Sequence, residues 1–104
     1  EHGVDVMDVS TGGIMSGVSI PVKPNYQVPF AEQVKSKADI PVTAVGLITK
    51  PKQAAKILAR GEADAVEIGR AALRDPYWPL RAANKLGIPS TEIPYAPQYV
   101  AGAY

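Results

Sequence analysis

The chain has 104 residues, of which 46% are apolar and 20% are charged, a composition typical of a packed globular domain. Eleven Lys and Arg against ten Asp and Glu leave a net charge of +1, which is too small to gather nucleic acid or anionic lipid by charge alone. With no Cys and one His, disulfides, thiolate zinc sites and His-based metal clusters are excluded. No apolar run approaches the roughly 20 residues that cross a bilayer. We therefore expect a cytoplasmic protein with neither membrane nor nucleic acid as a partner.

The first residues have the pattern of a helix end that leads into a strand. Glu1–His2 would close a helix, and Gly3 would cap it, because glycine takes the left-handed conformation without a steric clash. The chain does not begin with Met, so we interpret it as a fragment. His2 is interpreted as a solvated helix-end residue without a functional role.

Three short runs rich in β-branched residues each end at a glycine or a small polar residue, which is the pattern of a strand that enters a loop. They are Val4–Val9, Ile40–Val45 and Ala65–Ile68. The first is followed by a loop of 17 residues, Thr11–Gln27. Loops longer than about 12 to 15 residues usually serve a function.

The segments between and after the strands have the periodicity of amphipathic helices. Pro51–Gly61 is predicted as a helix with Thr49 as its N-cap and with a stripe of Ala54, Ala55, Ile57 and Leu58. A helix between the first two strands has its stripe at Phe30, Ala31, Val34 and Ala38. A third is capped by Asp75–Pro76, ends at Gly87 and carries Trp78, Leu80, Ala82, Ala83 and Leu86.

Strand and helix alternate three times, which predicts an α/β fold with parallel strands joined by right-handed crossovers. An open doubly wound sheet and a closed eight-stranded barrel both use this unit, and three units leave both architectures open. A full barrel needs about 250 residues. We expect residues 1–87 to form one α/β domain. Residues 88–104, which hold three prolines and three tyrosines, are predicted as an extended arm.

Gly46 and Gly69 stand at the carboxyl-terminal tips of the second and third strands, and Gly69 also opens a short helical stretch, Arg70–Leu73. A glycine lets an anion approach backbone N–H groups, and a helix N-terminus attracts negative charge, so the arrangement suits a phosphate. Barrels often bind phosphate after their seventh and eighth strands. The spacing also allows a purely structural alternative, in which both glycines permit tight turns and the arginine pairs with Glu67 or Asp75.

Six motifs occur in order along nearly the whole chain: Gly3–Asp5, Asp8–Gly12, Tyr26–Ala31, Ala44–Thr49, Ile68–Arg70 and Leu73–Pro76. Together they resemble the C-terminal third of the Old Yellow Enzyme family, above all its bacterial NADPH dehydrogenase, or ene-reductase, branch. The resemblance implies an FMN-containing (β/α)8 TIM barrel in which the three strands are the sixth to the eighth. It also implies hydride transfer from NADPH or NADH through the flavin to the activated C=C bond of an α,β-unsaturated carbonyl.

The resemblance further implies which residues hold the cofactor. The FMN phosphate would lie against Gly46 and Leu47 after the seventh strand and against Gly69 and Arg70 after the eighth, with Ser10 as a further contact. Residues 1–87 would then be part of an FMN-binding barrel. The family's catalytic residues belong to the earlier two-thirds of the barrel, so no catalytic residue is expected here. The alternatives are a phosphate-binding half-barrel without redox function and an interaction fragment held together by oligomerisation.

In this branch the C-terminal arm reaches the substrate site of a neighbouring subunit, which implies a homo-oligomer that acts on a small-molecule substrate. Val100–Gly102 stand where the branch has an Arg, so the resemblance does not extend to the residue that makes this contact. Tyr99 and Tyr104 are interpreted as surface packing residues, with a hydroxyl contact as the alternative.

Overall fold

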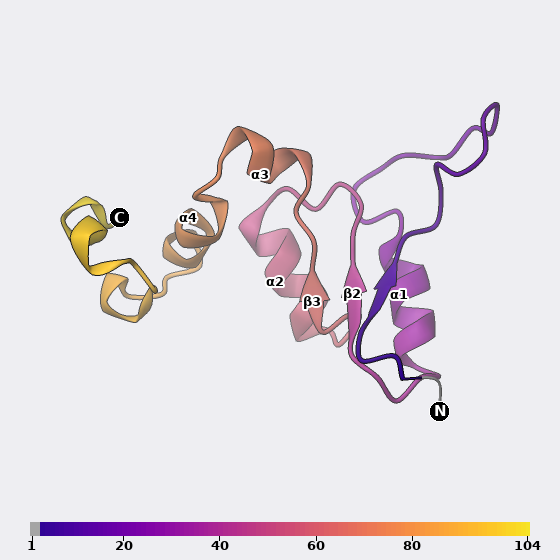
Figure 1. Cartoon of the computed structure of the whole chain (residues 1–104), viewed down its shortest axis with the longest axis horizontal. Coiled ribbons are helices and arrows are strands. Elements are labelled where there is room, and N and C mark those ends of the chain that lie inside the picture. Colours follow the sequence, from indigo (N-terminus) through magenta and orange to yellow (C-terminus); the bar gives the residue numbers. More distant parts are fainter. Residues whose placement is uncertain (1–2) are drawn as a thin grey trace.

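The computed structural model describes residues 3–104 and has a three-stranded parallel sheet with the order β1-β2-β3 (Figure 1). The strands are β1 (Met7–Val9), β2 (Val42–Ala44) and β3 (Ala65–Val66). Helix α1 (Val28–Lys35) connects β1 to β2, and α2 (Pro51–Ala59) connects β2 to β3. The alternation of strand and helix confirms the predicted α/β class. The expected helix end at residues 1–2 lies outside the described residues.

All three strands are shorter than predicted. The ladder between β1 and β2 runs only from the pair Met7–Val42 to the pair Val9–Ala44. Pro41 precedes β2, and a proline cannot donate to a ladder. At the other end Gly46 has a φ of +117°, which turns the chain out of the extended conformation.

The apolar stripe of α1 differs from the predicted one at Phe30. Ala31 is fully buried and Val28 is 3% exposed, whereas the Phe30 side chain is 47% exposed. Successive residues of a helix are turned by about 100°, so a neighbour of Ala31 in the chain points well away from the sheet. The expectation that Phe30 belongs to the core was wrong.

Helix α2 ends as predicted but begins differently. The N-cap residue is Lys50 and not Thr49. The side chain of Gln53 does the capping, because its Oε1 accepts the backbone N–H groups of Thr49 at 3.0 Å and Lys50 at 3.3 Å. Gly61 follows the helix with a φ of +69°, and its N–H donates to the carbonyl of Leu58 at 3.0 Å. Leu58 itself is 42% exposed, so it does not belong to the buried stripe.

After β3 the chain forms α3 (Arg70–Arg74) and then α4 (Trp78–Lys85), which packs beside α2. Asp75–Pro76 does not cap α4, whose N-cap residue is Tyr77. The carboxylate of Asp75 instead pairs with Arg81 at 2.5 Å. Gly87 ends the helix with a φ of +84°, as predicted.

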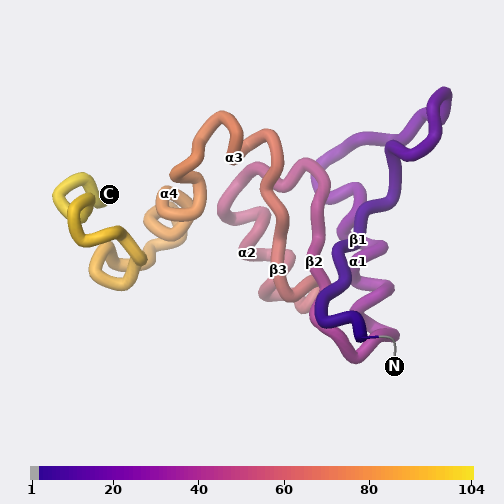
Figure 2. Tube along the Cα trace, in the orientation of Figure 1, coloured from indigo at the N-terminus to yellow at the C-terminus, as the bar shows by residue number. Residues whose placement is uncertain are grey.

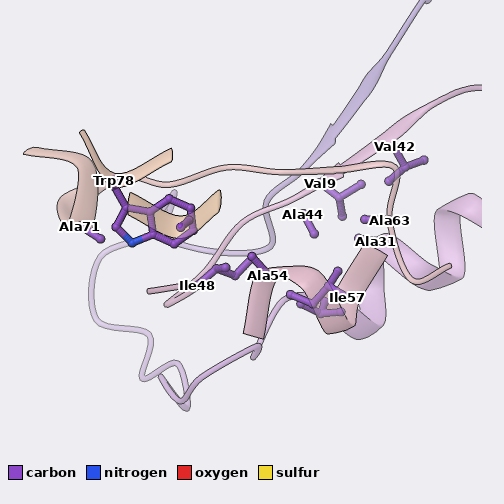
Figure 3. Packing of buried hydrophobic residues seen from close by; sticks show 12 residues of the cluster. Val9, Ala31, Val42, Ala44, Ile48, Ala54, Ile57, Ala63, Ala71 and Trp78 are labelled. Carbon is purple, nitrogen blue, oxygen red and sulfur yellow. The ribbon is translucent and has the colours of Figure 1, made fainter. Parts of the chain in front are cut away.

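The buried side chains of the strands and of the helices form one hydrophobic cluster (Figure 3). Val42 from β2 and Ile57 from α2 are both fully buried, and Trp78 lies at one end of the cluster. The indole Nε1 of Trp78 donates to the carbonyl of Thr49 at 3.1 Å. Because this bond satisfies the polar atom of a buried indole, it fixes α4 against the loop that precedes α2.

The long loop and the C-terminal tail lie at opposite ends of the molecule (Figure 2). The predicted loop Thr11–Gln27 extends beyond the sheet without a helix or strand. Within the tail, Ser90–Glu92 and Pro97–Gly102 form short 3-10 helices. Helices long and apolar enough to cross a bilayer are absent from the part of the chain that the structure describes.

Candidate functional site

A cavity of about 370 Å³ lies at the carboxyl-terminal end of the sheet. All five residues predicted to hold a phosphate line it: Ser10, Gly46, Leu47, Gly69 and Arg70. They follow three different strands, and the parallel topology brings the ends of those strands to one edge of the sheet. In the sequence, these residues are up to 60 positions apart.

The lining also includes residues that were not predicted to bind phosphate, among them Tyr26, Gln27, Glu67 and Arg74. Arg74 could have been predicted from the sequence, because it lies four residues after Arg70 and residues four apart share one face of a helix. Gln27 carries no comparable local signal, because its contacts are made with segments far away in the sequence.

Gly46 is required by the fold itself. Its φ of +117° is left-handed, and a Cβ atom there would lie 2.8 Å from the ring of Tyr26 and 2.9 Å from the amide nitrogen of Gln27. The structural alternative therefore applies to Gly46, which permits a tight turn whether or not an anion binds beside it. The following residue, Leu47, is also left-handed, with a φ of +50°. Its carbonyl accepts a hydrogen bond from Nε2 of Gln53 at 2.8 Å.

Gly69 has a different environment. Its φ is −84°, and, apart from Gly69 and its two chain neighbours, no atom of the described residues lies within 4 Å of the position that a Cβ would take. Packing against neighbours therefore does not account for a glycine here. Because Gly69 lines the cavity, the missing side chain leaves space in which a ligand can approach the backbone.

Backbone donors are available around this space. Within residues 3–104, the N–H groups of Gly46, Leu47, Gly69, Arg70 and Ala71 form no hydrogen bond. Helix α3 has only five residues, so its dipole adds little to the attraction of an anion. The predicted attraction therefore depends on the N–H groups themselves. Unpaired N–H groups that converge on one space are suited to phosphate oxygens.

The positive charge of the cavity comes from Arg70 and Arg74. The ion pairs of the described residues join other groups, Lys35 to Asp64, Arg60 to Glu62 and Arg81 to Asp75. Two guanidinium groups thus line the cavity without a carboxylate partner in this part of the chain, which leaves them available to an anion.

The predicted partners of Arg70 are both engaged elsewhere. The carboxylate of Glu67 accepts the hydroxyl of Thr43 at 2.5 Å, and that of Asp75 pairs with Arg81. Within residues 3–104, neither carboxylate forms an ion pair with Arg70. Among the described residues, no three His, Cys, Asp or Glu side chains gather in a metal-binding group.

The donor set fits the phosphate end of FMN: free N–H groups, two cationic side chains and a glycine whose Cβ would occupy the open space. The sequence profile of the NADH:flavin oxidoreductase / NADH oxidase family matches residues 1–88. The chain belongs to this family. Its membership confirms the flavin oxidoreductase family that the motifs resemble and favours it over the non-redox half-barrel.

Curated relatives of the family carry the name NADPH dehydrogenase. That of Geobacillus thermodenitrificans is 52% identical over 88 residues, which are 85% of this chain and 26% of the relative. That of a Geobacillus species is 49% identical over 102 residues, or 98% of this chain and 29% of the relative. That of Bacillus subtilis is 45% identical over 102 residues, with the same two shares, 98% and 29%. The chain thus spans little more than a quarter of the length of these relatives.

Proposed function

We propose that the cavity binds the phosphate of FMN in an NAD(P)H:flavin oxidoreductase that reduces the activated C=C bond of α,β-unsaturated carbonyls. The observation that carries the proposal is the convergence of Ser10, Gly46, Leu47, Gly69 and Arg70 on one cavity. Membership of a flavin oxidoreductase family supports FMN over other phosphorylated ligands.

Each lining group has a defined task in this proposal. Gly69 lets a phosphate oxygen approach the backbone, and the N–H groups of Gly69, Arg70 and Ala71 donate to it. The guanidinium of Arg70 presents a planar fork that can hold two oxygens at once, and Arg74 adds a second positive charge to the lining. When bound, FMN would supply the hydride chemistry at its flavin ring, while these residues would fix the phosphate that anchors it.

We also propose that β1, β2 and β3 are the sixth, seventh and eighth strands of a (β/α)8 barrel. Two features support this placement. The strands are parallel and neighbour one another in chain order, and the cavity lies beyond their carboxyl ends. Eight-stranded barrels commonly bind phosphate in the loops after their last two strands, beside a short extra helix, and α3 is such a helix.

The partners of the whole protein belong to the same proposal. We expect a small-molecule substrate and a homo-oligomer assembled through residues 88–104. The division of the chain into residues 1–87 and an arm at 88–104 stays a prediction, as does a cytoplasmic location.

The test is a titration of the full-length protein that carries these residues, stripped of flavin, with FMN and with riboflavin. We expect FMN to bind at least tenfold more tightly than riboflavin, because riboflavin lacks the phosphate. Addition of NADPH should then bleach the flavin absorbance, and an α,β-unsaturated ketone should restore it. A protein that binds no FMN, or binds both flavins equally, would contradict the proposal.

A further inference from the structure

Gln27 is a buried polar side chain at the junction between the long loop and α1. It is 3% exposed, and in the part of the chain that the structure describes no other polar side chain is buried to this degree. A buried amide is costly unless both its ends are hydrogen-bonded. The partners of this amide therefore indicate what it does.

The side chain of Gln27 does not cap its own helix. Gln27 is the N-cap residue of α1, a position at which polar side chains often bind the first N–H groups of the helix. Its side chain makes no such bond, although its carbonyl accepts the N–H of Phe30 at 3.1 Å. The amide is used for the sheet instead.

The amide of Gln27 joins the ends of two neighbouring strands. Its Oε1 accepts the backbone N–H of Thr11 at 2.5 Å and the Thr11 hydroxyl at 3.1 Å, and its Nε2 donates to the carbonyl of Val45 at 3.3 Å. The ladder of β1 and β2 ends at the pair Val9–Ala44. Gln27 therefore connects the backbones of the two strands just beyond this last pair, where the β-ladder has ended.

Both connected residues lie at the cavity, since Val45 is one of its lining residues and Thr11 is next to one. Thr11 follows Ser10, and Val45 precedes Gly46, which packs so tightly on Gln27 that a Cβ at Gly46 would lie 2.9 Å from Nε2. Any shift of this amide would move the two strand tips relative to each other.

We propose that Gln27 is a positioning residue that sets the separation of Ser10 and Gly46 and so shapes the phosphate end of the cavity, an inference that rests on the proposed FMN-binding function. The chemistry requires an amide. A glutamate could accept from Thr11 but could not donate to Val45, and a leucine of similar size could do neither.

The experiment compares Gln27→Leu with Asp64→Asn in the full-length protein. Asp64 makes the corresponding connection at the opposite end of the sheet, because its Oδ2 accepts the N–H of Val42 at 2.9 Å. Both variants should lower the melting temperature, so Asp64→Asn controls for a general loss of stability.

Two measurements distinguish positioning from mere stability. Gln27→Leu should raise the Kd of FMN at least tenfold and that of riboflavin less than twofold, whereas Asp64→Asn should change neither by more than twofold. In the flavin-free protein, Gln27→Leu should speed amide hydrogen exchange in residues 43–49, and Asp64→Asn should do so in residues 61–66.

Gln27→Leu protein with the wild-type Kd for FMN, or with exchange raised equally in both segments, would overturn the inference. Wild-type protein that binds no FMN would instead overturn the proposed function. In that case the exchange measurement still decides whether Gln27 holds the two strand tips.

Discussion

Asp64, in the loop that leads into β3, accepts a hydrogen bond from Nζ of Lys35 at the end of α1, with 2.6 Å between the two atoms. The second oxygen of the carboxylate accepts the backbone N–H of Val42. One side chain thus ties α1, β2 and the start of β3 together at the amino-terminal end of the sheet, opposite the cavity.

The Lys35 hydrogen bond, together with the Val42 N–H, holds the pKa of Asp64 below its usual value of 3.8. A carboxylate with a lowered pKa in the folded state stabilises the protein above the pKa of the unfolded state and loses this effect as the pH falls through the folded value. We expect Asp64→Asn to lower the melting temperature at pH 7, and we expect the difference from wild type to shrink below about pH 4. Thermal melts of both proteins from pH 7 to pH 3 check this. A difference that stays constant over this range would show that the ionised carboxylate is not the cause.

Gly46→Ala should destabilise the fold. The left-handed φ and the contacts with Tyr26 and Gln27 leave no room for a methyl group, so we expect a loss of about 1 to 3 kcal/mol. Urea unfolding of the full-length protein measures it. An unchanged midpoint would mean that the turn at Gly46 adapts without strain.

Gly69→Val should weaken the binding of FMN. A side chain there would enter the open space and push a phosphate away from the N–H groups, at a cost of about 1.5 to 3 kcal/mol, or at least tenfold in the Kd of FMN. The loss of stability should be smaller than for Gly46→Ala. Titration with FMN and a parallel unfolding curve separate the two effects, and normal FMN affinity in a folded variant would leave Gly69 as a turn residue only.

Substitutions of Arg70 should give a graded loss of FMN affinity from wild type to Arg70→Lys to Arg70→Ala. Lysine keeps the charge but not the planar fork, and alanine keeps neither. Riboflavin should bind all three proteins equally. Arg81→Ala is the matched control, because Arg81 pairs with Asp75 and does not line the cavity. A parallel fall in riboflavin affinity would assign Arg70 a structural role.

Trp78→Phe should weaken the attachment of α4. The substitution keeps an aromatic ring but removes the hydrogen bond to the carbonyl of Thr49, which we expect to cost about 1 to 3 kcal/mol. Chemical unfolding followed by far-UV circular dichroism gives the value. A variant as stable as wild type would show that packing alone holds the helix.

Some features of this protein are determined by short stretches of sequence. Gly61 and Gly87 end their helices as predicted because a left-handed residue after a helix depends only on the last turn. The alternation of strands and helices is likewise local, and it implies a parallel sheet. That topology is sufficient to bring Ser10, Gly46 and Gly69 to one edge.

Other features were decided by contacts between distant segments. Thr49 was predicted to cap α2, but its carbonyl accepts the indole N–H of Trp78, 29 residues away, while Gln53 supplies the cap. Gln27 has the sequence context of an ordinary loop residue, and its partners lie 16 and 18 residues away. A buried amide takes its role from whichever donors and acceptors the fold places within hydrogen-bond distance, and no periodicity along the chain encodes that distance.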